Sequence, residues 1–187
     1  MRSLLTGVGL MISLAAHGLS LRAQSPVSVG VGAGLAVPVG ALRHDVNPGL
    51  RALAMLDMGL PEMPMSLRVD LAYDRLGFQS TPALTAGTAG QEGGARTVAS
   101  ASVNLALISD DWERVVSPYA IGGVGFSHIA CTGRSDCGAY TQMGWNAGFG
   151  MRLGMFGLRG FTEARLHCVP KSEAEDCYIP VTVGLRF

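Results

Sequence analysis

The last ten residues of the chain alternate between two kinds of side chain with the period of a β-strand. Large apolar residues occupy every second position, at Ile179, Val181, Val183, Leu185 and Phe187. The positions between them carry Pro180, Thr182, Gly184 and Arg186. Because successive side chains of a strand point to opposite faces, one face of this strand is wholly apolar and the other is small or polar. Such a strand has to place its apolar face against a core or against lipid.

The same two-residue period recurs from Pro26 onward. Between 26 and 37, for example, valines and other apolar residues alternate mostly with glycines. The pattern predicts eight strands, at 26–37, 50–60, 65–73, 96–108, 118–126, 144–153, 158–167 and 178–187. Each is close to the ~9–11 residues that a tilted strand needs to cross a bilayer. The facing of 118–126 stays open, because Tyr119 and Ile121 oppose Val124 and Phe126.

The connections between these strands alternate in length. Short turns are expected at 61–64, 109–114 and 154–157, and longer loops at 38–48, 77–94, 129–139 and 168–177. A membrane barrel has short turns at one end and long loops at the other. Both ends of the mature chain are therefore expected on the side of the short turns, in the periplasm.

Composition and the N-terminal residues indicate an exported protein. Only 15% of the residues are charged and the formal net charge is zero, whereas a nucleic-acid-binding protein would show a basic excess. Residues 1–23 read as a secretory signal, with Arg2, an apolar stretch over 4–16 and cleavage expected after Ala23. The mature domain is then 24–187, with no nucleic-acid partner.

In an exported chain, cysteines are expected to form disulfides. The four cysteines fall in two close pairs, Cys131 with Cys137 and Cys168 with Cys177. Proximity favours these local pairings, although the sequence allows three. His167 with Cys168 and Cys177 matches no standard zinc spacing, so neither a metal site nor a cofactor is expected.

Several short motifs, in this order, resemble the outer-membrane β-barrel family that includes the OmpA transmembrane domain, OmpX and OmpW. They are Val29-Gly-Val-Gly32 with Pro38-Val-Gly40, Arg68-Val-Asp-Leu-Ala-Tyr73, Pro118-Tyr-Ala-Ile-Gly-Gly-Val-Gly125, Gly160-Phe-Thr-Glu-Ala-Arg165 and the terminal Phe187. The resemblance covers 24–187. It implies an all-β, eight-stranded antiparallel up-and-down transmembrane barrel, a monomer in contact with outer-membrane lipid. It also implies that Val183, Leu185 and Phe187 form the signal read by the barrel-assembly machinery.

A closed barrel brings its inward charges together. In hydrocarbon every backbone group must be paired within the protein, so the sheet has to close, and eight strands leave an interior just wide enough for side chains. The inward set contains both signs, at Arg51, Asp57, Arg68, Asp70, Asp74, Arg152, Glu163 and Arg165. Strands 65–73 and 158–167 lie opposite each other in such a ring. We therefore predict that Arg68, Asp70, Glu163 and Arg165 form an ionic network that plugs the lumen.

A soluble eight-stranded barrel such as a lipocalin would have the opposite facing, with apolar residues inside. Alternation alone does not separate the two folds. Glycine on the polar face favours the membrane barrel, because small residues suit a crowded interior better than a solvated exterior. These glycines include Gly32, Gly34, Gly148 and Gly150.

No arrangement of residues indicates catalysis. Ser127 and His128 are adjacent, so a strand points them to opposite faces, and they cannot act as nucleophile and base. His44 and Asp45 fall in a loop, and His167 is expected at the inner rim. We expect a non-enzymatic barrel with a structural or surface-interaction role through external loops. A narrow channel or carrier of small hydrophobic molecules, and a lipid A-modifying enzyme, remain alternatives.

Two further groups have structural interpretations. The aromatic residues Trp112, Trp145, Tyr119 and Tyr178 are expected at the membrane interface, where such side chains anchor barrels. The acidic residues Glu173, Glu175 and Asp176 are expected to form a solvated tip of the last loop.

Overall fold

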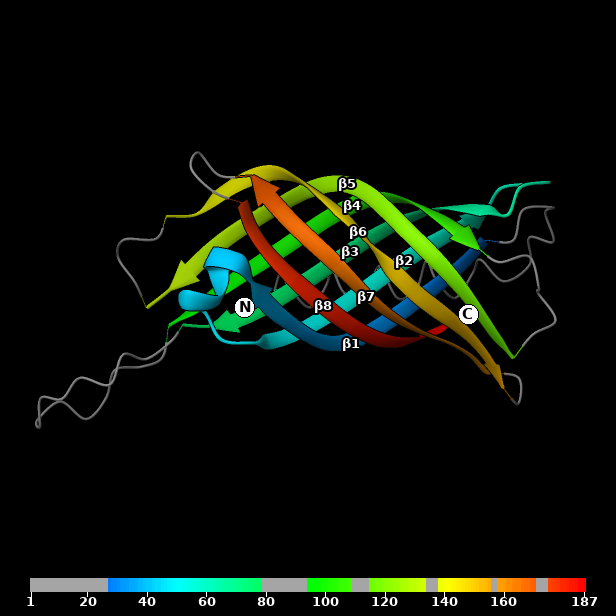
Figure 1. Cartoon of the computed structure of the whole chain (residues 1–187), viewed down its shortest axis with the longest axis horizontal. Coiled ribbons are helices and arrows are strands. Elements are labelled where there is room, and N and C mark those ends of the chain that lie inside the picture. The colour runs from blue at the N-terminus through cyan, green and yellow to red at the C-terminus, as the bar shows by residue number, and fades with distance from the viewer. Residues whose placement is uncertain (1–26, 79–93, 109–114, 134–137, 156–157, 171–174) are drawn as a thin grey trace, which may run out of the picture.

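A computed structural model describes residues 27–78, 94–108, 115–133, 138–155, 158–170 and 175–187. Each strand pairs with the next along the chain, and β1 pairs with β8, so the eight strands form a closed barrel (Figure 1). The strands are β1 (Val27–Val39), β2 (Gly49–Gly59), β3 (Met65–Gly77), β4 (Ala95–Ile108), β5 (Val116–Thr132), β6 (Tyr140–Met155), β7 (Leu158–Pro170) and β8 (Glu175–Arg186). All pairings are antiparallel. The predicted eight-stranded up-and-down barrel is therefore confirmed, whereas the predicted signal at 1–23 lies outside the described residues.

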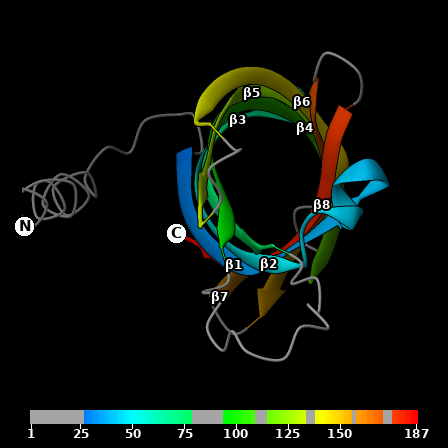
Figure 2. The ribbon, with the colours of Figure 1, turned by 90° about the vertical axis from the view of Figure 1, so that its left-hand side faces the viewer.

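The two ends of the barrel differ. A short 3-10 helix, η1 (Gly40–His44), follows β1 at what we call the loop end. The opposite end, which we call the terminal end, carries Val27 at the start of β1 and Phe187, whose backbone bonds to Val29. The view along the barrel shows the closed ring (Figure 2). No helix among the described residues is both long enough and apolar enough to span a membrane.

Two predicted connections are wrong. The connection predicted at 129–139 begins only after Thr132, because the last residues of β5 continue to pair with β4. The second error concerns the last connection. Cys168 and Cys177 are register partners in the ladder between β7 and β8, which continues to Pro170 and Glu175. The last connection is therefore 171–174 rather than 168–177, and the strict alternation of long and short connections fails there. The disulfide therefore lies within the β7–β8 hairpin and not at the ends of a loop.

The exposed face of the strands is mainly apolar, and most charged side chains of the strands face in. Val29, Leu71 and Phe149 are 50%, 56% and 75% exposed, whereas Arg165 and Glu163 are 1% and 4% exposed. This is the facing of a membrane barrel and the reverse of a lipocalin. The structure also settles β5, where Tyr119 and Ile121 face in and Val124 and Phe126 face out.

Glycine makes room for large side chains in the lumen. Gly150 of β6 is the register partner of Tyr119, and a Cβ built there would overlap the tyrosine ring. A Cβ at Gly184 would likewise overlap the ring of Phe161. Small residues on the inward face thus allow an eight-stranded ring to hold aromatic side chains.

Candidate functional site: the lumen

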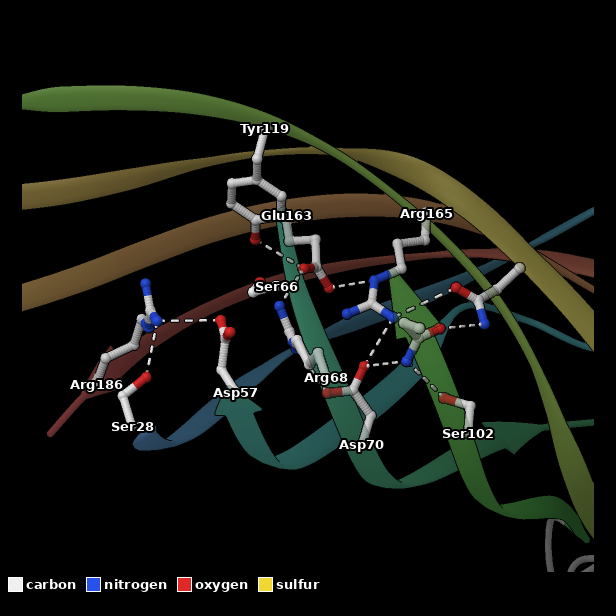
Figure 3. Close-up of polar contacts among 12 residues, drawn as sticks. Ser28, Asp57, Ser66, Arg68, Asp70, Ser102, Tyr119, Glu163, Arg165 and Arg186 are labelled. Carbon is white, nitrogen blue, oxygen red and sulfur yellow. Dashed lines mark hydrogen bonds and ion pairs between the residues drawn. The ribbon is translucent and has the colours of Figure 1, made fainter. Parts of the chain in front are cut away.

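Four charged residues at the centre of the lumen form a closed set of ion pairs. Arg68 and Asp70 come from β3, and Glu163 and Arg165 come from β7 (Figure 3). Arg68 contacts Asp70 at 2.7 Å and Glu163 at 2.8 Å. Arg165 contacts Asp70 at 2.8 Å and Glu163 at 2.5 Å. Each arginine therefore contacts both carboxylates, and the structure brings together the four residues that sequence analysis selected.

Uncharged polar residues on the strands between extend this central network. The Tyr119 hydroxyl of β5 donates to Glu163 Oε2 at 2.7 Å. The Asn104 amide of β4 donates to Asp70 Oδ2 at 2.9 Å, and the Asn146 amide of β6 donates to Asn104 Oδ1 at 2.8 Å. Strands β3 to β7 are thus linked through the lumen as well as through the sheet. Sequence analysis missed these three residues.

A second polar layer lies nearer the loop end. Arg51 Nη1 donates to both oxygens of Asp74, at 2.8 and 3.0 Å, and the Tyr178 hydroxyl donates to Asp74 Oδ2 at 3.1 Å. His167 stacks on Tyr178 with 5.4 Å between the ring centroids. This layer joins β2, β3, β7 and β8.

An apolar cluster adjoins this layer and closes the loop end of the barrel. Leu42 of η1 and Val46 are 2% and 1% exposed, because they pack inward against side chains from the strand ends. The cluster comprises Ala36, Leu42, Val46, Leu76, Val98, Ile129, Val169 and Tyr178. Beside it, Arg96 contacts Asp176 at 2.6 Å. The loop predicted at 38–48 therefore folds partly into the mouth instead of standing free.

The terminal end of the lumen is more open. Asp57 of β2 contacts Arg152 of β6 at 2.9 Å and Arg186 of β8 at 3.0 Å. Arg186 also donates to the Ser28 hydroxyl at 2.7 Å (Figure 3). These residues border a cavity of about 470 Å³.

The predicted position at the membrane interface is wrong for two of the four aromatic residues. Tyr119 and Tyr178 lie inside the barrel, 5% and 3% exposed, because both hydroxyls donate to buried carboxylates. Tyr119 shares its face of β5 with positions 117, 123, 125 and 127, which carry only serine or glycine. Such small side chains are typical of the inward face, and this is the signal that places Tyr119 inside. Trp145 does face out and is 39% exposed. Trp112 lies outside the described residues.

The cysteines support structure rather than chemistry. A disulfide joins Cys168 to Cys177. Cys131 is also disulfide-bonded, and Cys137 lies outside the described residues. Glu175 lies close to Cys168 and Cys177, but the disulfide consumes the two thiolates that a metal would require.

The remaining predicted groups are distributed as follows. Ser127 faces the lumen, whereas His128 faces out and hydrogen-bonds to Thr141 at 2.9 Å, so the two point apart. Of the expected acidic tip, Asp176 instead pairs with Arg96, and Glu173 lies outside the described residues. Val183, Leu185 and Phe187 face out, at 61%, 44% and 68% exposed, and their role in assembly stays a prediction.

Neither a family model nor a curated protein sequence matches the chain. Solved structures do match. Neisserial surface protein A (NspA) superposes with a TM-score of 0.62 at 14% identity, over 88% of this chain and 98% of NspA. A major outer membrane protein from Thermus thermophilus gives 0.58 at 12% identity, over 88% and 99% of the two chains. The Yersinia pestis outer membrane protein Ail gives 0.50 at 15% identity, over 86% and 99%.

The closed ring and the apolar exterior define the class of protein, an eight-stranded membrane-spanning β-barrel, and the matching outer-membrane proteins have the same fold. At these identities the likeness is one of fold. What this barrel does has to be inferred from its own lumen and loops.

Proposed function

We propose that the protein is a non-enzymatic, integral outer-membrane barrel with a closed lumen, which has a structural or surface-interaction role through its loop end. The terminal end lies in the periplasm in this proposal, and the loop end faces the exterior. The observation that carries it is the filling of the lumen by ion pairs across the ring, closed at the loop end by the cluster around Leu42. NspA, a barrel of the same fold, is by name a surface protein.

The filled lumen disfavours the channel alternative. An ion crossing the barrel would have to separate Arg68 from Glu163 and Arg165 from Asp70, all of which are at most 4% exposed. Separating such pairs leaves uncompensated charges in a poorly hydrated space, which costs several kcal/mol per ion. Aliphatic side chains such as those of Leu42 and Leu76 in the cluster at the loop end cannot replace the hydration shell of an ion.

Planar-bilayer recording of the purified, refolded barrel tests this proposal. Wild-type protein is expected to insert without steady single-channel openings, because no hydrated path crosses the central network. A porin recorded in the same bilayer shows that openings would be detected. Reproducible unitary openings from the wild-type barrel would contradict the closed lumen and favour the channel.

A further inference from the structure

Arginine side chains gather around the cavity at the terminal end. Three arginines border the cavity, Arg152, Arg159 and Arg186, from the adjacent strands β6, β7 and β8. Asp57 is the one carboxylate among the described residues of its wall. Because Asp57 contacts both Arg152 and Arg186, a single negative charge is shared between two guanidinium groups.

Two of these arginines lie directly opposite each other in the sheet. Arg159 and Arg186 are direct register partners across β7 and β8, and like charges placed opposite each other destabilise a sheet. Arg159 is exposed to the cavity mouth and makes no hydrogen bond or ion pair to the described residues. Arg186 Nε is buried and has no hydrogen-bond acceptor among them. An anion between the two guanidinium groups would relieve the repulsion and satisfy this donor.

The remaining wall suits an oxyanion with several acceptor atoms. Ser28 and Ser66 contribute hydroxyl groups, which donate to oxygen without adding charge. Guanidinium groups bind phosphate through paired N–H donors. The cavity volume of about 470 Å³ also leaves room for a substituent on the phosphate.

We propose that this cavity is a binding site for a phosphate group. A phosphate would direct its oxygens at Arg159 and Arg186, the register partners whose positive charges lie opposite each other. The same chemistry comes from inorganic phosphate and from the headgroup of a phospholipid in the adjacent leaflet. The site adds a ligand to an end of the lumen that the proposed function treats as structural alone.

Calorimetric titration of the refolded barrel with sodium phosphate in octyl glucoside, a phosphate-free nonionic detergent, tests the site. The expected result is saturable binding of one phosphate per barrel, absent when sodium chloride of equal ionic strength is injected. Arg159→Gln is the informative variant, because Arg159 takes no part in the ion pairs of the lumen. Its phosphate affinity is expected to fall at least about tenfold, through loss of one charge-assisted contact.

Arg75→Gln is the matched control, since Arg75 is an exposed arginine of β3 near the loop end. Its phosphate affinity is expected to equal that of the wild type. The gel mobility of unboiled samples shows that each variant is folded. No saturable phosphate heat in the wild type, or an equal loss of affinity in both variants, would overturn the proposal.

Two further arms identify the occupant. The first arm repeats the titration in phosphatidylglycerol nanodiscs. Phosphate binding that is unchanged there indicates that the site takes the free ion. If phosphate binds in octyl glucoside but not in the nanodiscs, a lipid headgroup occupies the site. The connection between β4 and β5 carries Asp110, Asp111 and Glu113 at the same end of the barrel. If the wild type binds no phosphate but the triple variant D110N/D111N/E113Q does, these carboxylates are the counterions and the proposal is wrong.

Discussion

Charged residues in this lumen are stabilised by one another rather than by water. Glu163 illustrates the balance, because its two oxygens contact Arg68, Arg165 and the Tyr119 hydroxyl while its side chain is 2% exposed. Taking such a carboxylate out of water is unfavourable, and only the full set of partners compensates for it. At the scale of single residues, stability should therefore depend strongly on each member of the central network.

The substitution Glu163→Ala is expected to lower the free energy of unfolding by about 3–5 kcal/mol, because two buried guanidinium groups then share the single carboxylate of Asp70. Urea unfolding of the refolded barrel, followed by the mobility of unboiled samples on a denaturing gel, measures the change. Glu175→Ala removes an exposed carboxylate and is expected to change stability by less than about 0.5 kcal/mol. Equal unfolding midpoints for Glu163→Ala and the wild type would show that the network contributes nothing to stability.

Tyr119 provides a finer test at the same scale. Tyr119→Phe keeps the ring against Gly150 but removes the hydroxyl that donates to Glu163. Loss of a hydrogen bond to a buried charge is expected to cost about 1.5–3 kcal/mol in the same unfolding assay. Tyr73→Phe is the control, because Tyr73 faces out and is 50% exposed. If both variants have the urea midpoint of the wild type, the hydroxyl of Tyr119 does not stabilise the network.

At the scale of elements, alternation was enough to predict the strands but not every contact. Lipid outside and charge inside impose a period of two, which is visible in the sequence, and ring closure alone places Arg68 opposite Glu163 although they are 95 positions apart. The same period places Asn104 and Asn146 on the inward face, but it does not show that their amides join the network, because an uncharged side chain has no obligatory partner of opposite charge. Leu42 and Val46 belong to a connection, where no period shows that they fold into the mouth.

The hairpin of β7 and β8 closes the barrel and is crosslinked by Cys168–Cys177. Replacing both cysteines by alanine is expected to destabilise the barrel by roughly 2.5–3 kcal/mol, as estimated from the loop entropy of a disulfide of this span. The urea midpoint of the double variant, compared with that of the oxidised wild type, measures this effect. An unchanged midpoint would mean that the ladder between β7 and β8 already restrains the hairpin fully.

The last residue of the chain, directly after β8, offers a test of assembly. The backbone of Phe187 exchanges hydrogen bonds with Val29 at 2.8 and 3.1 Å, and its ring is exposed. Phe187→Ala keeps these backbone bonds, so refolding in detergent is expected to match the wild type. If the ring is read by the assembly machinery, the amount of folded barrel in outer-membrane fractions should fall several-fold. Val181→Ala, which is also outward on β8, is the control, and an equal loss for both variants would contradict a specific signal.

At the scale of the whole molecule, the two ends are chemically different. The loop end is closed by the apolar cluster around Leu42 and by the Arg96–Asp176 ion pair, whereas the terminal end opens into an arginine-bordered cavity. A barrel with one sealed and one open end has a direction in the membrane. The proposed orientation therefore decides whether the cavity meets the periplasm or the exterior.

The single lysine of the chain makes this orientation measurable. Lys171 falls in the 171–174 connection between β7 and β8, which is at the loop end, so an amine-reactive reagent that does not cross membranes should modify Lys171 on intact cells. The α-amino group of the mature chain is expected at the terminal end and should react only after the outer membrane is permeabilised. Lys171→Arg removes the reactive amine without changing charge, and its labelling on intact cells should fall to background. Peptide mass spectrometry identifies each modified amine. If the α-amino group is labelled on intact cells and Lys171 is not, the orientation is the reverse of the proposed one. The arginine-bordered cavity would then face the exterior, where its phosphate would come from the medium or from the outer leaflet instead of from the periplasm.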